Sequence, residues 1–182
     1  AFLAGFRVLN YLPMWIDVHI GLWTPAVYAY ILYYPLCILS FFIVKDFDVL
    51  KKGAMAFVSS VFFNFLIFVI YPVAFYRPEN LVVDDLSSFI LSKIWVFDTV
   101  ANSFPSQHVT SIWVCAFFVS VAHRNRKWIP ALAFVIAFII SASTLFVKQH
   151  YVWDVIAGFF VACAVSFVMF RKTLLTQKNE ML

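Results

Sequence analysis

Residues 128–170 read WIPALAFVIAFIISASTLFVKQHYVWDVIAGFFVACAVSFVMF, two long apolar runs separated by the polar stretch KQHYVWD. Each run is long enough for a helix that crosses about 30 Å of hydrocarbon. A charged side chain at mid-membrane costs about 2.5–3.5 kcal/mol, so ionisable groups between two such runs indicate a functional site. His150 and Asp154 are four residues apart and share one face of a helix. The carboxylate can hold one imidazole nitrogen and leave the other free to react.

Composition assigns the chain to the membrane proteins. Of its 182 residues 64% are hydrophobic and only 12% are charged, whereas soluble domains carry about 25% charged residues. We therefore predict an all-α, multi-pass transmembrane helix bundle that forms one domain over residues 1–182. The net charge of +4 is carried by basic residues in loops between the apolar segments. The expected partner is the bilayer, and nothing indicates nucleic-acid binding.

Five apolar segments are predicted to cross the membrane, because each is about 17–23 residues long and a helix of that length crosses about 30 Å of hydrocarbon. These segments are residues 26–44, 54–76, 106–122, 128–147 and 152–170. Residues 1–12 are too short to span. They fit the end of a first helix whose start is missing, which would give six spans in the full chain; an interfacial helix is the alternative.

Basic residues predict the orientation, because loops rich in Lys and Arg stay in the cytoplasm. Nine of the 13 fall on one side of the predicted spans: Lys45, Lys51, Lys52, Arg124, Arg126, Lys127, Arg171, Lys172 and Lys178. The other four are Arg7, Arg77, Lys93 and Lys148. The loops that contain the KQHYVWD stretch and Arg77 are therefore predicted to lie on the extracytoplasmic side.

The longest predicted loop, residues 77–104, contains a helix signal of its own. Asp84 and Asp85 precede the mostly apolar stretch LSSFILSKIWVF, which is typical of an N-cap followed by a helix. Two interpretations fit this stretch, a lid over a lipid-sized opening and a packed loop helix.

The predicted outer face gathers the groups that phosphoryl transfer requires. Arg77 and Lys148 are cations that can hold phosphate oxygens and balance the charge of the transition state. Ser106 and Gln107 follow Pro105 at the start of a predicted helix, where free backbone N–H groups bind anions. We expect these residues to bind the phosphate of the substrate.

Two histidines on this face can divide the chemistry. One attacks phosphorus as a neutral imidazole, and the other protonates the leaving oxygen. Asp154 would orient the attacking ring, as a carboxylate does beside a catalytic histidine. A structural hydrogen-bonded pair is the alternative for His150 and Asp154, and interfacial capping is the alternative for His108. A metal site of two histidines and an aspartate is disfavoured, because phosphate-binding cations crowd the same place.

The motifs Arg77-Pro78, Pro105-Ser106-Gln107-His108 and His150-x-x-x-Asp154 resemble those of the type 2 phosphatidic acid phosphatase superfamily of membrane lipid phosphatases and phosphotransferases. That family carries K-x6-R-P, P-S-G-H and S-R-x5-H-x3-D. The resemblance implies that His150 is the nucleophile, Asp154 its partner and His108 the general acid. It implies that Arg77, Ser106 and Gln107 bind phosphate, and that no metal or cofactor takes part.

Three positions depart from the family pattern: Ile70 replaces the first-motif Lys, Thr144 replaces the third-motif Arg, and Gln107 replaces the Gly. Lys148 is four residues beyond Thr144, so on a continuing helix it would restore the lost charge on the same face. Asp98 and Asn102, before the P-S-Q-H turn, are expected to support it.

The pattern TLFVKQHYVWDVIAG, with D-x-x-x-N-S-F-P-S-x-H before it, resembles the inositol phosphorylceramide synthase-like subgroup. That subgroup includes both phosphatases and phosphotransferases. A phosphatase acting on a lipid phosphate is the first hypothesis and a phosphotransferase to a lipid alcohol the second. The two missing cations favour a third, a non-catalytic lipid-binding bundle, whereas the intact His108, His150 and Asp154 argue against it.

Overall fold

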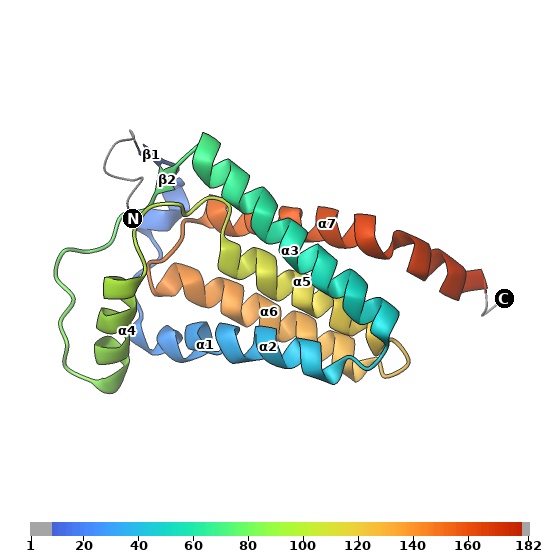
Figure 1. The fold of residues 1–182 in the computed structure, drawn as a ribbon. Helices are drawn as coiled ribbons and strands as arrows, with labels where there is room; N and C mark the ends of the chain where they lie inside the picture. The colour runs from blue at the N-terminus through green and yellow to red at the C-terminus, as the bar shows by residue number, and fades with distance from the viewer. Residues whose placement is uncertain (1–8, 180–182) are drawn as a thin grey trace.

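The computed structural model describes residues 9–179, which form a helical bundle with one very small sheet (Figure 1). The helices are α1 (Val27–Ile31), α2 (Tyr33–Ile43), α3 (Phe47–Ile70), α4 (Leu86–Phe97), α5 (Gln107–Ala122), α6 (Trp128–Phe146) and α7 (Val152–Asn179). Strands β1 (Asn10–Tyr11) and β2 (Val73–Ala74) and the 3₁₀ turns η2 (Trp15–Val18) and η3 (Thr24–Ala26) complete the fold. The prediction of an all-α bundle is confirmed.

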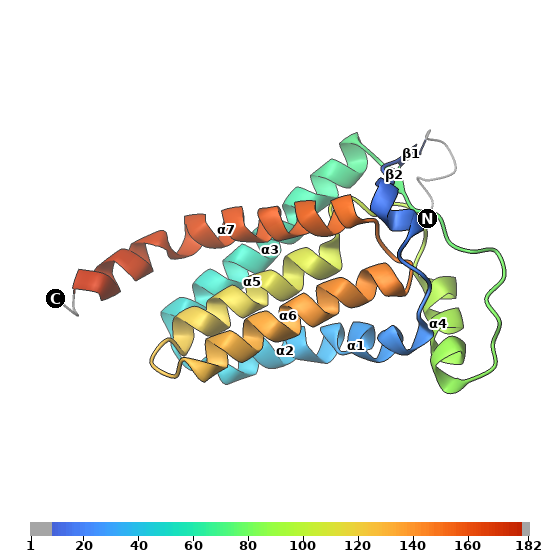
Figure 2. The same cartoon turned by 180° about the vertical axis from the view of Figure 1, so that it is seen from behind.

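Four helical segments within the described residues are long and apolar enough to cross a membrane: Thr24–Ile43, Phe47–Ile70, Trp128–Phe146 and Val152–Thr173. The predicted span at 106–122 is the apolar helix α5, which is shorter, with 16 residues. It lies at the centre of the bundle, where α2, α3, α6 and α7 pack around it (Figures 1 and 2). Because its neighbours cover it, α5 has many buried side chains, including Phe118 and Val114.

The second span begins and ends earlier than predicted. Helix α3 starts at Phe47, where the carboxylate of Asp46 accepts hydrogen bonds from the N–H groups of Asp48 and Val49, so the helix includes Lys51 and Lys52. It ends at Ile70, and the following residues are extended and form β2. Arg77 therefore lies in an extended segment beyond the sheet and not at a helix end.

The helix predicted for residues 1–12 is wrong where the structure describes it. Asn10 and Tyr11 form β1, which pairs in parallel with β2 in the register Asn10↔Val73 and Tyr11↔Ala74. Residues 1–8 lie outside the described part of the chain. The backbone groups of this short segment form their hydrogen bonds with the chain that leaves α3. A helix of two residues could not satisfy these groups by itself.

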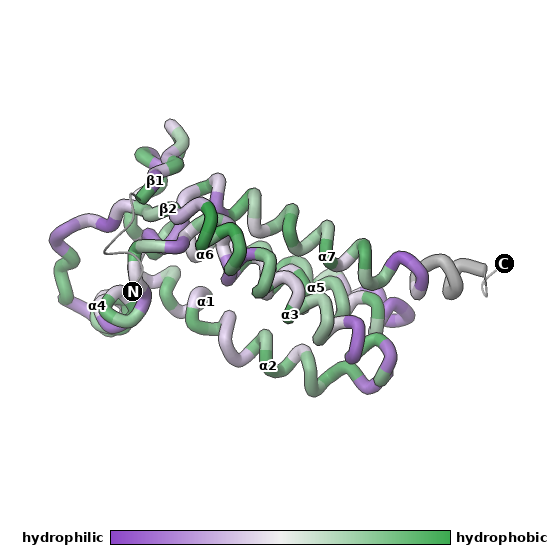
Figure 3. The backbone as a smooth tube through the Cα atoms, turned by 45° about the horizontal axis from the view of Figure 1, so that its top comes forward, coloured by the Kyte–Doolittle hydropathy of each residue, from purple (hydrophilic) through white to green (hydrophobic). Residues whose placement is uncertain are grey.

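The loops divide between the two ends of the bundle. One end carries the segments 71–85, 98–106 and 147–151 together with α4, and we call it the site end. The opposite end carries residues 44–46 and 123–127, where His123 Nε2 lies 3.2 Å from the carbonyl oxygen of Ile43. Figure 3 shows hydrophilic residues concentrated at both ends and hydrophobic residues between them. This is the distribution of a bundle whose middle lies in hydrocarbon.

Helix α4 confirms the predicted N-cap. The side chain of Asp85 accepts a hydrogen bond from Ser88 N at 2.7 Å, and the helix runs over LSSFILSKIWVF as predicted. Hydrogen bonds from Ser88 and Ser87 lower the pKa of the Asp85 carboxyl. On its inner face Leu91 is buried against Val27, Tyr30 and Val147. Helix α4 is therefore packed on the start of the first span, beside the site end.

Candidate active site

Three segments that are distant in sequence meet at the site end. Ala74 forms an antiparallel bridge with Ala101, and the N–H of Ser103 donates to Val73 O at 2.9 Å. The N–H of Ser106 donates to Asp154 O at 2.9 Å, which joins the start of α5 to the start of α7. The structure thus brings together the motif segments that sequence analysis assigned to one face.

The two histidines lie next to each other. His108 Nδ1 is 3.4 Å from His150 Nε2, with ring centroids 5.6 Å apart. His150 Nδ1 is 3.4 Å from Asp154 Oδ2, and that oxygen also accepts from Tyr151 N at 2.9 Å. His150 precedes the first residue of α7, so only Asp154 is inside the helix, yet the spacing of four still brings the two side chains together. Asp154 is fully buried, and its carboxylate lies at the Nδ1 edge of the imidazole.

The first turn of α7 is held by a residue from the N-terminal segment. Asp17 Oδ1 accepts from Val152 N at 3.0 Å, and Asp17 Oδ2 accepts from Met14 N at 2.6 Å. A helix N-terminus leaves backbone donors without intrahelical acceptors, and this carboxylate satisfies one of them. Asp17 thereby positions the turn that carries His150 and Asp154.

Sequence analysis missed Tyr30, although its hydroxyl touches His108. Tyr30 is fully buried in α1; its hydroxyl donates to Asp98 Oδ2 at 2.8 Å and lies 2.9 Å from His108 Nε2. Its only sequence context is an apolar span that also contains Tyr28, Tyr33 and Tyr34, so nothing in the sequence distinguishes it. Asp98 was expected to support the P-S-Q-H segment, and in the structure it contacts His108 of that segment through the Tyr30 hydroxyl.

Ser106 and Gln107 occupy different positions at the start of α5. Ser106 is fully buried, and its Oγ accepts from Val109 N at 3.3 Å as the N-cap of the helix. Gln107 Oε1 accepts from Asn64 Nδ2 at 3.0 Å, and its Nε2 donates to Ser111 Oγ at 2.6 Å. The side chain of Gln107 thus links α5 to α3, and Gln107 also borders the first of the two cavities described below.

Arg77 is bound on several sides. Its Nη1 donates to the carbonyls of Trp95 at 2.8 Å and Asp98 at 2.9 Å, and its Nη2 donates to Gln149 Oε1 at 2.6 Å. The guanidinium also stacks on Phe75, 4.9 Å from the ring centroid. Burial lowers the pKa of Arg77 and the charge of Asp98 opposes this shift, but an arginine stays charged in proteins. Arg77 therefore joins α4, the segment before α5 and the KQHYVWD loop.

Lys148 is not placed as the sequence predicted. Helix α6 ends at Phe146, and Lys148 adopts a left-handed conformation with φ of 54°, so the helix does not continue from Thr144. Its Nζ donates to the carbonyl oxygens of Asp17, at 3.3 Å, and Ile20. Burial lowers the pKa of Lys148, while the nearby Asp17 carboxylate opposes this shift. The expectation that Lys148 shares one helix face with Thr144 is wrong.

Two cavities border His150. The first, of about 160 Å³, lies beside both histidines and is lined by Phe68, Phe75, Asp98, Thr99, Ala101, Asn102, Ser103, Gln107, His108, Gln149 and His150. The second, of about 280 Å³, is lined by Lys148, Tyr151, Tyr76 and residues of the N-terminal segment, together with Phe75 and His150. The first contains both histidines together with amide and hydroxyl side chains, whereas His150 is the one histidine that lines the second.

Among residues 9–179, no group of three or more His, Cys, Asp and Glu side chains is arranged to hold a metal ion. The polar side chains around the histidines are amides, hydroxyls, Tyr30 and the single carboxylates Asp98 and Asp154.

Comparison with known proteins identifies the family. The sequence profile of the PAP2 superfamily matches residues 26–177, which is most of the chain. The chain belongs to the PAP2 superfamily. Membership, together with the four long apolar helices, describes an integral membrane protein with a phosphatase- or phosphotransferase-type lipid function. No curated protein and no solved structure matches the chain, so the resemblance to the inositol phosphorylceramide synthase-like subgroup stays a prediction.

Proposed function

We propose that this PAP2 superfamily member hydrolyses a phosphomonoester or diphosphate of a lipid at the extracytoplasmic face, without a metal, through a phosphohistidine intermediate. The observation that carries the proposal is the arrangement around His150. Asp154 lies against Nδ1, and His108 lies 3.4 Å from Nε2. A nucleophile, a group that orients it and a proton donor are thus within reach of one another.

In the first step, the lone pair of His150 Nε2 attacks phosphorus and the bond from phosphorus to the lipid oxygen breaks. His108 Nδ1 gives its proton to that oxygen, and the lipid alcohol leaves. In the second step, His108 takes a proton from water while the water oxygen attacks phosphorus. The bond from phosphorus to Nε2 then breaks and releases inorganic phosphate. Asp154 stabilises the positive charge that His150 carries between the two steps.

The phosphate is proposed to occupy the cavity that both histidines line. Gln107 and His108 begin α5, where backbone N–H groups lack intrahelical acceptors and attract anions, and Ser106 fixes this turn as its N-cap. Arg77 reaches the cavity through Gln149, and exchanging that amide oxygen for a phosphate oxygen would bring the cation onto the substrate. Lys148 lines the second cavity, where its ammonium fits the second phosphate of a diphosphate.

The second cavity supports a second candidate function. Because His150 borders both cavities, a lipid alcohol bound in the second one could approach phosphohistidine in place of water. The chain would then transfer the phospho-group to that alcohol. The family match supports both reaction types.

The decisive experiment uses purified protein in detergent with a panel of lipid monophosphates and diphosphates, with and without lipid alcohols. We expect phosphate release by the natural protein and a loss of about 10⁴-fold or more in His150→Ala. The matched control is His123→Ala, since His123 lies at the opposite end of the bundle.

Equal activity of His150→Ala and the natural protein would overturn the mechanism. Product that forms only with an added lipid alcohol would replace hydrolysis by transfer. Loss of activity with a chelator would overturn the metal-free mechanism. No activity with any substrate would favour a lipid-binding role.

A further inference from the structure

We propose that Tyr30 and Asp98 are positioning residues that hold His108 in the tautomer with its proton on Nε2, so that Nδ1 faces the reaction. This inference rests on the proposed role of His108. The three groups form a chain of contacts: Tyr30 OH to Asp98 Oδ2 at 2.8 Å, and Tyr30 OH to His108 Nε2 at 2.9 Å. They come from α1, the segment before α5, and α5 itself.

The tautomer follows from counting protons. A phenol has one proton to donate, and an ionised carboxylate only accepts. Tyr30 therefore donates to Asp98, and its oxygen is left to accept from His108. His108 can satisfy that acceptor only with a proton on Nε2. In neutral His108 the lone pair is then on Nδ1, the atom that lies 3.4 Å from His150 Nε2.

The same count applies to His150. Asp154 Oδ2 lies 3.4 Å from His150 Nδ1 and fixes the proton there, so Nε2 holds a lone pair. The lone pairs of His108 Nδ1 and His150 Nε2 then face each other. One additional proton can bind between these two nitrogens. A proton bound to His108 Nδ1 is the one that the leaving oxygen requires. Each histidine is thus oriented by a carboxylate, His150 directly and His108 through the Tyr30 hydroxyl.

Asp98 is itself held in place. Gln149 Nε2 donates to Asp98 Oδ2 at 3.3 Å, and Arg77 Nη1 donates to the Asp98 carbonyl at 2.9 Å. Gln149 and Arg77 are in turn bonded to each other at 2.6 Å. Asp98 is therefore positioned from two sides, by the KQHYVWD loop and by the segment after β2.

The other groups that face His108 do not provide this function. Tyr33 and Tyr34 contact its ring, with centroids 4.8 and 6.2 Å away, and Tyr30 itself lies at 4.9 Å. The hydroxyl of Tyr33 interacts with Ser111, and the hydroxyl of Tyr34 interacts with Tyr30. The titratable groups around His108 are thus the three tyrosines and His150, with Asp98 behind Tyr30 and Asp154 behind His150. Within the described residues, only Tyr30 and His150 are found within hydrogen-bond distance of its ring nitrogens.

The test compares Tyr30→Phe with Tyr33→Phe, since each removes one hydroxyl from a ring that contacts His108. We expect Tyr30→Phe to lower kcat about 10- to 100-fold, as loss of an orienting partner does at other histidine sites, and to leave KM within about threefold. The Tyr30 oxygen and the Asp98 charge stabilise protonated His108. Loss of the Tyr30 oxygen should therefore move the alkaline limb of the rate profile to lower pH, by about one unit. Tyr33→Phe should leave that limb in place.

A second readout does not depend on activity. The chain has four histidines, so nitrogen-15 NMR of the labelled protein in detergent can report the tautomer of each ring, with His108→Gln to assign the signal. We expect a proton on Nε2 of His108 in the natural protein and a mixture of tautomers in Tyr30→Phe. A proton on Nδ1 in the natural protein, or an unchanged spectrum and rate profile in Tyr30→Phe, would overturn the proposal. An inactive natural protein with the expected spectrum would contradict the proposed function and leave the positioning intact.

Discussion

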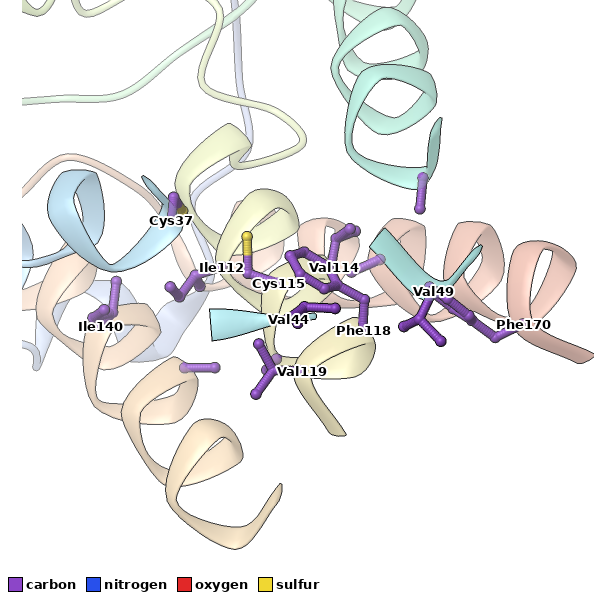
Figure 4. Packing of buried hydrophobic residues seen from close by; sticks show 14 residues of the cluster. Cys37, Val44, Val49, Ile112, Val114, Cys115, Phe118, Val119, Ile140 and Phe170 are labelled. Atoms are coloured by element: carbon purple, nitrogen blue, oxygen red, sulfur yellow. The ribbon is translucent and has the colours of Figure 1, made fainter. Parts of the chain in front are cut away.

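The two halves of α5 are held in different ways. At the site end, Thr110 donates to the carbonyl of Ser106 at 2.9 Å and lies 3.1 Å from the carbonyl of Gly158, while Gln107 links to Asn64 and Ser111. At the opposite end, Val114, Cys115, Phe118 and Val119 pack with Cys37, Val44 and Val49 in an apolar cluster (Figure 4). The half at the site end is held by hydrogen bonds between polar groups, and the other half is held by the packing of apolar side chains.

This difference reflects what holds helices together in lipid. Hydrocarbon tails are as apolar as leucine, so apolar side chains gain little by leaving lipid for the bundle interior. The apolar half of α5 is therefore stabilised by close packing. The polar half is stabilised by hydrogen bonds, because an unpaired polar group in hydrocarbon is costly. A substitution in the apolar half should therefore change stability, whereas a substitution in the polar half should change activity.

The largest expected effect is that of Asp154→Asn at the site end. The amide can no longer fix the proton on His150 Nδ1 or stabilise its positive charge. We therefore expect phosphate release to fall about 10⁴-fold, as it does when other catalytic histidines lose their carboxylate. Rates measured in detergent with Asp48→Asn as the control test this, since Asp48 is exposed and pairs with Lys52 away from the site. A loss smaller than tenfold would contradict the role of Asp154.

The next effect compares two glycines that let neighbouring helices approach α5. A Cβ at Gly158 would meet the backbone oxygen of Ser106 at 2.7 Å, whereas a Cβ at Gly53 would meet the Phe118 ring at 2.7 Å. The Ser106 backbone cannot move away from this Cβ without shifting the turn that carries His108. Misplacement of a catalytic group by about 1 Å can cost about 10²-fold in rate. We expect Gly158→Ala to lose activity by about that factor and Gly53→Ala to keep its rate within about threefold. Equal losses in the two variants would remove the distinction between the ends.

The smallest effect is expected from Phe118→Ala in the apolar cluster. Its side chain is fully buried against Phe41, with ring centroids 5.0 Å apart. Phe→Ala in a water-soluble core costs about 3–5 kcal/mol. In lipid the transfer contribution is largely absent, so we expect the free energy of unfolding to fall by about 2 kcal/mol. Unfolding in mixed detergents measures this, and Phe42→Ala at a largely exposed position is the control. A strong loss of kcat in folded Phe118→Ala would show that the two ends are coupled.

Much of this arrangement could be predicted from local patterns. The apolar runs predicted the helices α2, α3, α6 and α7, and the Asp85 cap predicted α4, because hydropathy and capping act within one element. The spacing of four between His150 and Asp154 predicted their contact, although His150 precedes the helix. The end of α3 at Ile70 was missed although Pro72 marks it, because a proline cannot continue a helix and disfavours helical backbone in the residue before it. That the chain then pairs Val73 and Ala74 with β1 could not be predicted from local patterns.

The sequence by itself determined that this chain is a membrane helix bundle with two histidines and an aspartate in PAP2-like motifs, because composition and short spacings carry that information. Only the tertiary structure decided that Tyr30 contacts His108, 78 residues away, and that Asp17 caps α7 from 135 residues away. It also decided that Lys148 turns to the carbonyl of Asp17. These contacts arise where helices from distant parts of the chain pack against one another, and no local preference in the sequence specifies them.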